Sequence, residues 1–464
     1  MSTAMDYHEV VPRPYYPRLQ RMAAEQNDAL QDLILFLDAS PTPFHACREV
    51  GQRLDQAGFS RLDEREPFHL EPNARAYVVR GGTIVAFVAG KRPPAETGFC
   101  MVGAHTDSPN LRLKPLPDFT NAGYRQLAIE PYGGVLQSTW LDRDLGLAGR
   151  VTLRGGASEL VRIDRTLGTI PSLAIHLNRE VNKEGLVLNA EKHLHPLVGL
   201  VGLDGDASPR FDELLLEAIA ATPSAGAARS DIVGFDLALF DLRGATLGGA
   251  AGELVHSARL DNLASCHSAC QALIATGPAG DATRVLALFD HEEVGSQSAV
   301  GARSELLRAL LERVALSYSE ASADAWARAA ARSFFVSVDM AHGVHPNYPD
   351  KHDKLHRPLL GKGPVVKLNV NQSYATDGAG QGAFVEACRA EGVETQVFSA
   401  RNDIPCGSTI GPITAARLGV RTVDVGNPML AMHSCRETAA SSDALAMTRV
   451  LRRLFSAPPT FSAT

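Results

Sequence analysis

The stretch Val285-Leu-Ala-Leu-Phe-Asp-His-Glu-Glu-Val-Gly295 runs from apolar residues straight into a pair of carboxylates. An apolar run that ends in charge and glycine predicts a buried strand that delivers acidic groups to the edge of a sheet. Neighbouring side chains on an extended chain point to opposite sides, so Glu292 and Glu293 are expected to have different roles. Glu293 then suits a metal ligand, and Glu292 suits a group that takes a proton. For an isolated Glu-Glu pair a solvated strand end is the commoner explanation. Residues elsewhere in the chain must therefore decide between a solvated strand end and a metal site.

Other apolar runs also end in a residue that can bind a metal. Residues 98–104 run into His105, and Asp107 follows two residues later. A carboxylate near a histidine can fix the histidine tautomer and raise its basicity as a ligand. Residues 334–338 run into Asp339, and Asp261 lies where a helix is expected to begin. For Asp261 alone, an N-terminal cap is the simpler role.

Composition narrows the class of protein. The chain of 464 residues allows two or three domains, and 45% hydrophobic with 21% charged residues is typical of a globular protein. A net charge of −7 provides no basic field for nucleic acid or an anionic membrane. The 7 cysteines are scattered and form no CxxC pair, which indicates a reducing compartment. The acidic N-terminus lacks the features of a signal peptide and no apolar run is long enough to span a membrane, so we expect a cytoplasmic protein.

The order of predicted elements indicates an α/β fold with an insertion. Strands alternate with helices at both ends of the chain, which predicts a mixed sheet flanked by helices. We expect residues 1–109 and 246–464 to form one domain and residues 110–245 to form an inserted β-rich domain. The expected elements are a polar arm over residues 1–25; helices at 27–37, near 45, 210–221, 304–316, 321–332, 378–390, 412–418 and 437–455; a hairpin at 77–88; and strands at 232–242, 285–293, 365–370, 396–399 and 421–425.

Six residues form a set of two imidazoles and four carboxylates without a cysteine: His105, Asp261, Glu292, Glu293, Asp339 and His433. This donor set suits zinc, cobalt or manganese, and a shared carboxylate between two ions is usual in two-metal hydrolases. Five of the six would be ligands and one Glu a base. The histidine-rich loop that contains His342, His345, His352 and His356 is a rival metal cluster. Alternatively, this loop borders the site and His345 contacts the substrate.

Motifs of other enzyme classes are missing. The sequence His291-Glu-Glu-Val-Gly295 lacks the second histidine of HExxH, and no GxGxxG, GxxxxGK[ST] or GxSxG occurs. Zincin, dinucleotide-binding, P-loop and serine-hydrolase interpretations are therefore disfavoured. His176 lies among apolar residues of the inserted block, and composition alone favours a core histidine there.

Several stretches resemble the aspartyl aminopeptidases in the same order across residues 40–455. They are Ala104-His-Thr-Asp-Ser-Pro109, Ala174-Ile-His-Leu-Asn-Arg179, Ser257-Ala-Arg-Leu-Asp-Asn262, Asp290-His-Glu-Glu-Val-Gly-Ser296, Asp339-Met-Ala-His-Gly-Val-His-Pro-Asn-Tyr348, Arg401-Asn-Asp-Ile-Pro-Cys-Gly407 and Ala431-Met-His-Ser434. The resemblance implies a metallopeptidase with two divalent ions per subunit, most simply Zn²⁺, with Co²⁺ or Mn²⁺ as alternatives. It also implies that the insertion is a dimerisation domain and that dimers assemble into a dodecamer.

The resemblance implies a role for each matching residue. Asp261 would bridge the ions, Glu292 would be the general base, and Asp107 would support His105. His105 and Asp339 would bind one ion, and Glu293 and His433 the other. Three residues would contact substrate: His176 from a neighbouring subunit, and Lys367 with Tyr374 beside an acidic side chain.

The expected reaction is removal of an unblocked N-terminal Asp or Glu from short peptides. The first alternative is a two-metal aminopeptidase or amidohydrolase of other specificity. The second is an assembly or binding protein that kept the fold and lost catalysis.

Overall fold

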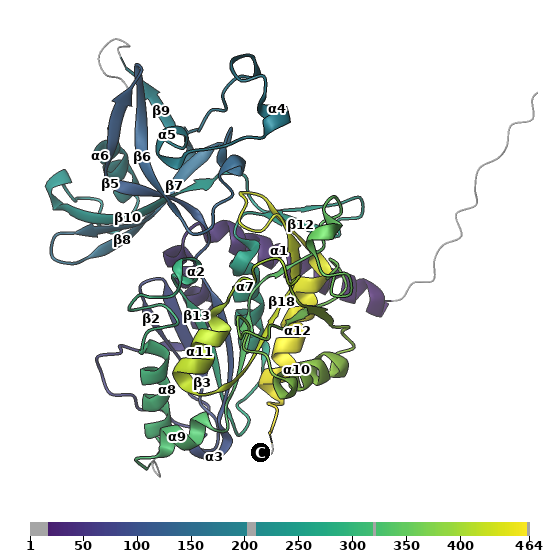
Figure 1. Ribbon diagram of the computed structural model, residues 1–464. Coiled ribbons are helices and arrows are strands. Elements are labelled where there is room, and N and C mark those ends of the chain that lie inside the picture. Colours follow the sequence, from purple (N-terminus) through teal and green to yellow (C-terminus); the bar gives the residue numbers. More distant parts are fainter. Residues whose placement is uncertain (1–16, 202–209, 319–321, 462–464) are drawn as a thin grey trace, which may run out of the picture.

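The computed structural model describes residues 17–201, 210–318 and 322–461. A nine-stranded mixed sheet forms the centre of the larger part of the molecule, drawn in the lower half of Figure 1. Strand β4 lies between its parallel neighbours β13 and β14, and β18 continues the parallel run. In sheet order the strands are β1 (Ser60–Arg61), β2 (Arg75–Arg80), β3 (Thr83–Val88), β13 (Thr283–Phe289), β4 (Phe99–His105), β14 (Phe334–Val338), β18 (Arg421–Gly426), β16 (Val365–Lys367) and β17 (Gln396–Phe398).

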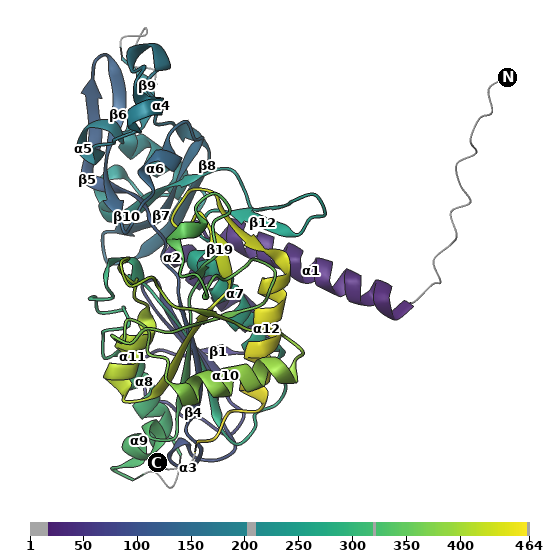
Figure 2. The same ribbon diagram turned by 45° about the vertical axis from the view of Figure 1, so that its right-hand side comes forward.

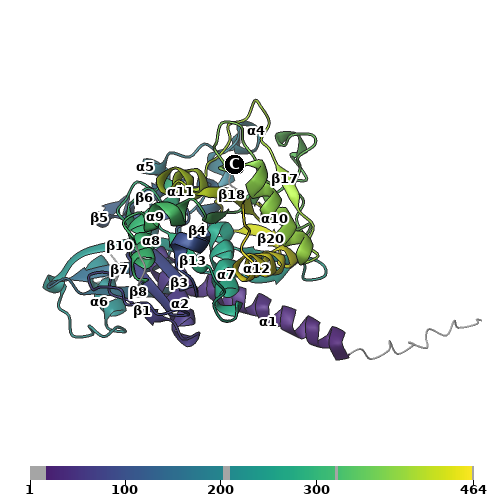
Figure 3. The same ribbon diagram turned by 90° about the horizontal axis from the view of Figure 1, so that it is seen from below.

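Helices cover both faces of this sheet, as Figure 3 shows. One apolar core joins the sheet to α1 (Pro17–Ala39), α2 (Pro43–Gln56), α7 (Leu260–Ala275), α10 (Gly378–Ala390) and α12 (Ser441–Ser456). A second core joins the other face to α8 (Leu306–Leu316), α9 (Ala325–Ala330) and α11 (Ile410–Leu418), and the short α3 (Pro94–Thr97) lies against α9. A sheet buried on both faces explains why its strands read as continuous apolar runs.

Residues 110–241 supply all strands of a separate six-stranded sheet. This sheet lies above the nine-stranded sheet in Figures 1 and 2 and has its own apolar core. In order its strands are β8 (Ser158–Gly168), β7 (Leu145–Leu153), β10 (Ile232–Asp241), β5 (Asn110–Asn121), β6 (Tyr124–Tyr132) and β9 (Leu197–Leu200). Helix α6 (Phe211–Ile219) packs into the core, while α4 (Val181–Glu184) and α5 (Ala190–His193) are single turns.

A third sheet connects distant parts of the chain. It consists of β11 (Thr246–Gly248), β12 (Leu254–Ser257), β20 (Glu437–Ala440), β19 (Pro428–Leu430) and β15 (Ala341–His342). The sequence patterns gave no sign of it, because its strands are only two to four residues long. The pairing of Ser257 with Glu437 brings the start of α7 close to the C-terminal part of the chain.

The mixed α/β fold predicted from the sequence is confirmed. The hairpin at 77–88 forms as β2 and β3, with Arg80 paired to Thr83 across the turn. Helix α10 has the predicted bounds of residues 378–390. All seven cysteines lie within the described residues and are free thiols. Within the described ranges, no helix has the length and apolarity needed to cross a bilayer.

Several predicted elements are wrong in part, among them the predicted strand at 365–370, which ends at Lys367. Residues 17–25 belong to α1 rather than to a polar arm, because Pro17 takes the first helical position, where its missing N–H costs nothing; the rest of the predicted arm lies outside the described residues. The predicted helix at 437–455 begins only at Ser441, since Glu437–Ala440 pair with β12 and β19. The predicted strand at 285–293 ends at Phe289.

Candidate metal centre

Three parallel strands bring the first group of predicted ligands to one edge of the central sheet. His105 ends β4 and pairs with Phe289, the last residue of β13. Asp339 follows β14, which pairs with the other side of β4. The carboxyl ends of parallel neighbours meet at one edge, so His105, Asp339 and the residues after Phe289 lie close together.

The two glutamates lie on a tight turn rather than on an extended strand. His291 has a left-handed conformation with a φ of 65°, a 3-10 turn covers Glu292–Val294, and Gly295 follows with a φ of 90°. The carboxylate of Asp107 accepts the backbone N–H groups of Glu292 at 3.0 Å and Glu293 at 3.1 Å. Glu292 and Glu293 therefore do not alternate along a strand, contrary to the prediction, because the turn directs both carboxylates toward the site.

The carboxylates of Glu292 and Glu293 nevertheless have different neighbours. Glu293 Oε1 lies 3.4 Å from His433 Nε2, whereas Glu292 Oε2 lies 4.0 Å from His105 Nε2. The two carboxylates thus approach different imidazoles.

Asp261 occupies the centre of the cluster. Its Oδ1 lies 3.4 Å from His105 Nε2, and its Oδ2 lies 3.5 Å from His433 Nε2. Asp339 Oδ1 lies 3.4 Å from the same His105 nitrogen. Among the hydrogen bonds of the described residues, no backbone N–H donates to the Asp261 carboxylate, whose two oxygens face the imidazoles instead, so Asp261 is not an N-terminal cap. One carboxylate with an imidazole on either side is suited to bridging two cations.

Both imidazoles are oriented for ligation by backbone carbonyls. His105 Nδ1 donates to the carbonyl of Asp107 at 2.9 Å, and His433 Nδ1 donates to the carbonyl of Gly134 at 3.0 Å. Each histidine therefore keeps the lone pair of Nε2 directed at the carboxylates. Asp107 supports His105 chiefly through its carbonyl, and its carboxylate also accepts the hydroxyl of Tyr132 at 2.7 Å.

The residues fit divalent cations. Asp261 Oδ1 and Glu293 Oε1 are buried acceptors without a hydrogen-bond partner. The ligand atoms gather in three overlapping groups, each within 4.8 Å. These groups are His105 with Asp261 and Asp339; Asp261 with Glu293 and His433; and His105 with Glu292 and Glu293. Oxygen and imidazole donors without thiolate suit Zn²⁺ and similar ions.

The electrostatics of the cluster also favour bound cations. Burial raises the pKa of the Glu292 carboxyl to about 8, with His105 opposing and Asp339 adding to the rise. Burial lowers the pKa of His105, but Asp107, Asp261 and Asp339 outweigh it and raise that pKa well above its usual value. So many carboxylates in a buried site leave it short of positive charge, which bound cations would supply.

The predicted substrate residues divide into two places. Lys367 is 2% exposed, and its Nζ lies 3.5 Å from Asp339 Oδ2 and 5.5 Å from the ring centroid of the buried Tyr374. His176 instead lies on the exposed turn Ile175–Leu177 of the inserted block, so the core-histidine interpretation is wrong. Among the contacts of the described residues, none joins His176 to the metal centre.

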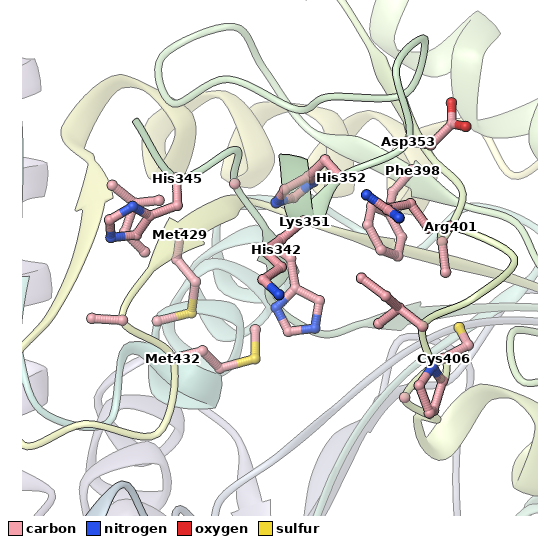
Figure 4. A pocket seen from close by; sticks show the side chains of 17 residues that line it. His342, His345, Lys351, His352, Asp353, Phe398, Arg401, Cys406, Met429 and Met432 are labelled. Carbon is pink, nitrogen blue, oxygen red and sulfur yellow. The ribbon is translucent and has the colours of Figure 1, made fainter. Parts of the chain in front are cut away.

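A pocket of about 320 Å³ adjoins the segment that carries His433, and side chains that line it are drawn in Figure 4. Its wall includes His342, His345 and Met432, the residue before His433. Phe398 lines it as well, and the ring of Phe398 lies 6.4 Å from that of Tyr374. Within the described ranges, no group of three possible ligands includes a histidine of the 342–356 loop, so the rival metal cluster does not form.

The sequence analysis missed Tyr132 and Glu437, which support the centre from β6 and β20. Glu437 follows His433 by four residues, and that spacing was the only signal available. The contacts of Glu437 with Asp261 and of Tyr132 with Asp107 are not local, because the partners lie 176 and 25 residues apart.

Imidazole and carboxylate side chains gathered at one edge of a mixed sheet, at the ends of its parallel strands, are typical of a metal-dependent hydrolase. The family model for aminopeptidase I zinc metalloproteases (M18) matches residues 36–455. A probable M18 family aminopeptidase 2 of Azotobacter vinelandii is 46% identical over 432 residues, which cover 92% of this chain and 98% of that protein. The chain belongs to the M18 family, and it is a metalloaminopeptidase.

Solved structures agree with this assignment. The Ape4 chain of a complex with Nbr1 superposes with a TM-score of 0.88 at 39% identity, covering 94% of this chain and 87% of that one. The S. cerevesiae mApe1 dodecamer superposes with a TM-score of 0.80 at 30% identity, covering 94% and 97%.

Proposed function

We propose that this aminopeptidase removes unblocked N-terminal Asp or Glu from short peptides with two divalent ions per subunit, most simply zinc. One ion would bind His105 and Asp339, the other Glu293 and His433, with Asp261 between them. The observation that carries the two-ion assignment is Asp261, whose two carboxylate oxygens face a different imidazole each.

When bound, the ions polarise the scissile carbonyl and lower the pKa of a water molecule. Glu292 takes the proton of that water at a carboxylate oxygen and passes it to the leaving amine, a role worth roughly 10²- to 10⁴-fold. The position of Glu292 supports this role as the base, because the Asp107 carboxylate accepts the backbone N–H of Glu292 and so holds the turn in place. Asp107 therefore orients both the base and His105.

Lys367 provides the preference for acidic residues. A buried substrate carboxylate needs a charged or hydrogen-bonding partner. Lys367 is itself buried and next to a proposed ligand, so a peptide bound at the centre would present its first side chain near this ammonium. Tyr374 flanks the ammonium, and His345 lies on the wall of the adjoining pocket, where it would contact the peptide.

The active enzyme is an oligomer in which the block at 110–245 forms the dimer contact. Its loop exposes apolar side chains, with Leu177 74% and Val187 85% exposed. Such exposure is typical of a surface that another chain covers. His176 lies within this loop and would complete the site of a neighbouring subunit. The dodecameric mApe1 structure supports the same assembly here. We also propose a cytoplasmic location, because the seven cysteines are free thiols, as in a reducing compartment.

The test is turnover of Asp-Ala, Glu-Ala and Leu-Ala by the purified full chain, before chelation, after chelation, and after Zn²⁺, Co²⁺ or Mn²⁺ is added back. We expect metal-dependent cleavage with Asp or Glu preferred over Leu. Preference for Leu-Ala would keep the metal chemistry and contradict the assigned specificity. No cleavage with any of the three ions would favour an assembly protein without catalysis.

A further inference from the structure

Glu437 is a buried carboxylate that contacts both halves of the metal centre, and it belongs to none of the three groups of possible ligands. It is 1% exposed and begins β20. Its Oε2 accepts the backbone N–H of Asp261 at 3.1 Å, and its Oε1 accepts the backbone N–H of His433 at 2.6 Å. Each oxygen therefore holds one of the two segments that carry the central carboxylate and the second imidazole.

Both segments have backbone conformations that need support. His433 has a φ of 70° and Ala431 a φ of 56°, and before Asp261 the φ of Arg259 is 63°. Residues other than glycine rarely adopt this left-handed region, and they remain there only when surrounding contacts hold them. The two hydrogen bonds to Glu437 are such contacts.

A carboxylate suits this position better than other side chains do. Both of its oxygens accept and neither donates, whereas an amide presents an NH₂ group to one of the two N–H donors. Within the described ranges no ion pair to Glu437 occurs. Burial and the nearby Asp261 raise the pKa of Glu437, so its negative charge depends on the backbone N–H groups that it accepts and on the positive charge that bound cations would supply.

Asp107 provides the same support on the opposite side of the site, where its carboxylate accepts the N–H groups of Glu292 and Glu293. The centre is thus built between two buried carboxylates that bond to the backbone of the ligands. Of these two, only Asp107 lies in a stretch that the sequence motifs made prominent.

We propose that Glu437 is a positioning residue that sets the separation of Asp261 and His433 and thereby the affinity of the site for divalent metal. The inference rests on the proposed ligands. It predicts a loss of metal affinity that general destabilisation of the fold would not produce.

The experiment measures Zn²⁺ affinity of the full chain by competition with a chromogenic chelator, with Glu437→Gln as the test variant. We expect Zn²⁺ affinity to fall about 10- to 100-fold, the range usual for residues that orient ligands. The matched control is Asp443→Asn. Asp443 is also 1% exposed and accepts two backbone N–H groups, of Gly361 at 2.7 Å and Gly363 at 2.9 Å, but those residues carry no proposed ligand. Both variants should lose thermal stability, and only Glu437→Gln should lose affinity for Zn²⁺.

Equal affinity losses in the two variants, or unchanged affinity in Glu437→Gln, would overturn the positioning role. If Glu437→Gln does not fold, Glu437→Asp replaces it, since the shorter carboxylate cannot reach both N–H groups; wild-type affinity there would also overturn the role. A His433→Ala variant distinguishes failure of the proposed ligand set from failure of the proposed Glu437 role. If it binds Zn²⁺ normally, the proposed ligand set fails together with the Glu437 role; if it loses Zn²⁺ while Glu437→Gln keeps it, only the role of Glu437 fails.

Discussion

The metal centre and the loop that carries His176 differ in how completely this one chain builds them. At the centre, buried carboxylates accept backbone N–H groups, both imidazoles donate to carbonyls, and Lys367 is almost fully buried. The loop at 173–187 instead exposes apolar side chains to solvent. One chain thus positions nearly all of the proposed ligands and the base by itself, whereas the exposed apolar surface of the inserted block is typical of a surface that a second chain would cover.

Replacing Glu292 by Gln tests whether the chemistry resides within one chain, and it should have the largest effect. Turnover should fall by roughly 10²- to 10⁴-fold, because the amide cannot take the proton of the attacking water. Zinc content per subunit should stay at the wild-type level, since Glu292 is not a proposed ligand. The measurement is kcat on Asp-Ala together with metal analysis of the same sample. Glu293→Gln is the control and should lose zinc as well as turnover; a Glu292→Gln enzyme with near wild-type kcat would refute the base assignment.

Replacing His176 by Ala tests whether the inserted block completes the site of a neighbour. Activity should fall about 100-fold, as expected for a lost positioning contact, while stability changes by less than about 0.5 kcal/mol because His176 is exposed. Thermal unfolding and kcat/KM on Asp-Ala measure the two effects.

Mixing that variant with Glu292→Gln sharpens the test. A mixed dimer contains one site with an intact Glu292 and an intact partner histidine, so random reassembly should restore up to about a quarter of wild-type activity. No recovery after verified subunit exchange would indicate that His176 acts within its own chain or not at all.

Replacing Lys367 by Met tests whether the centre alone sets substrate preference. We expect kcat/KM on Asp-Ala to fall about 10- to 100-fold, the size of a lost charge-assisted hydrogen bond, with a smaller loss on Leu-Ala. Equal losses on the two dipeptides would mean that Lys367 acts mainly by supporting Asp339, from which its Nζ lies 3.5 Å.

Local sequence patterns predicted those parts of the site whose geometry is decided within a few residues. His105 and Asp339 each end or follow a buried strand, and an apolar run that stops at a polar residue carries that information. The turn at Glu292 was missed because the apolar run does not show that β13 ends at Phe289, before the left-handed His291.

Contacts between distant segments could not be predicted in this way. Glu437 meets Asp261 only after β20 pairs with β12, and the N–H of Asp261 comes from 176 residues earlier in the chain. A pattern for Glu437–Ala440 alone favours helix, and the sheet pairing overrides it. The proposed role of His176 depends on a second chain, which no pattern within one chain can reveal.

The smallest expected effect concerns α1, whose residues are neither proposed ligands nor part of the exposed loop at 173–187. Asp32 on α1 accepts hydrogen bonds from His267 at 2.7 Å, Gln271 at 2.8 Å and Arg53 at 2.7 Å. Burial opposes ionisation of Asp32, but the bonds from His267 and Arg53 outweigh it and lower its pKa to about 2.

A lowered pKa in the folded state means that this stabilisation is complete above the usual carboxyl pKa and is lost as the pH falls toward 2. Asp32→Asn should therefore lower the free energy of unfolding by about 1 kcal/mol at pH 7, a small value because the Asp32 side chain is 35% exposed. The difference between variant and wild type should shrink as the pH is lowered from 5 to about 3, which urea unfolding at several pH values measures. Zinc affinity and kcat should be unchanged. A variant that lost zinc would show that α1 packing reaches the metal centre, and the centre would then be less self-sufficient than its internal hydrogen bonds suggest.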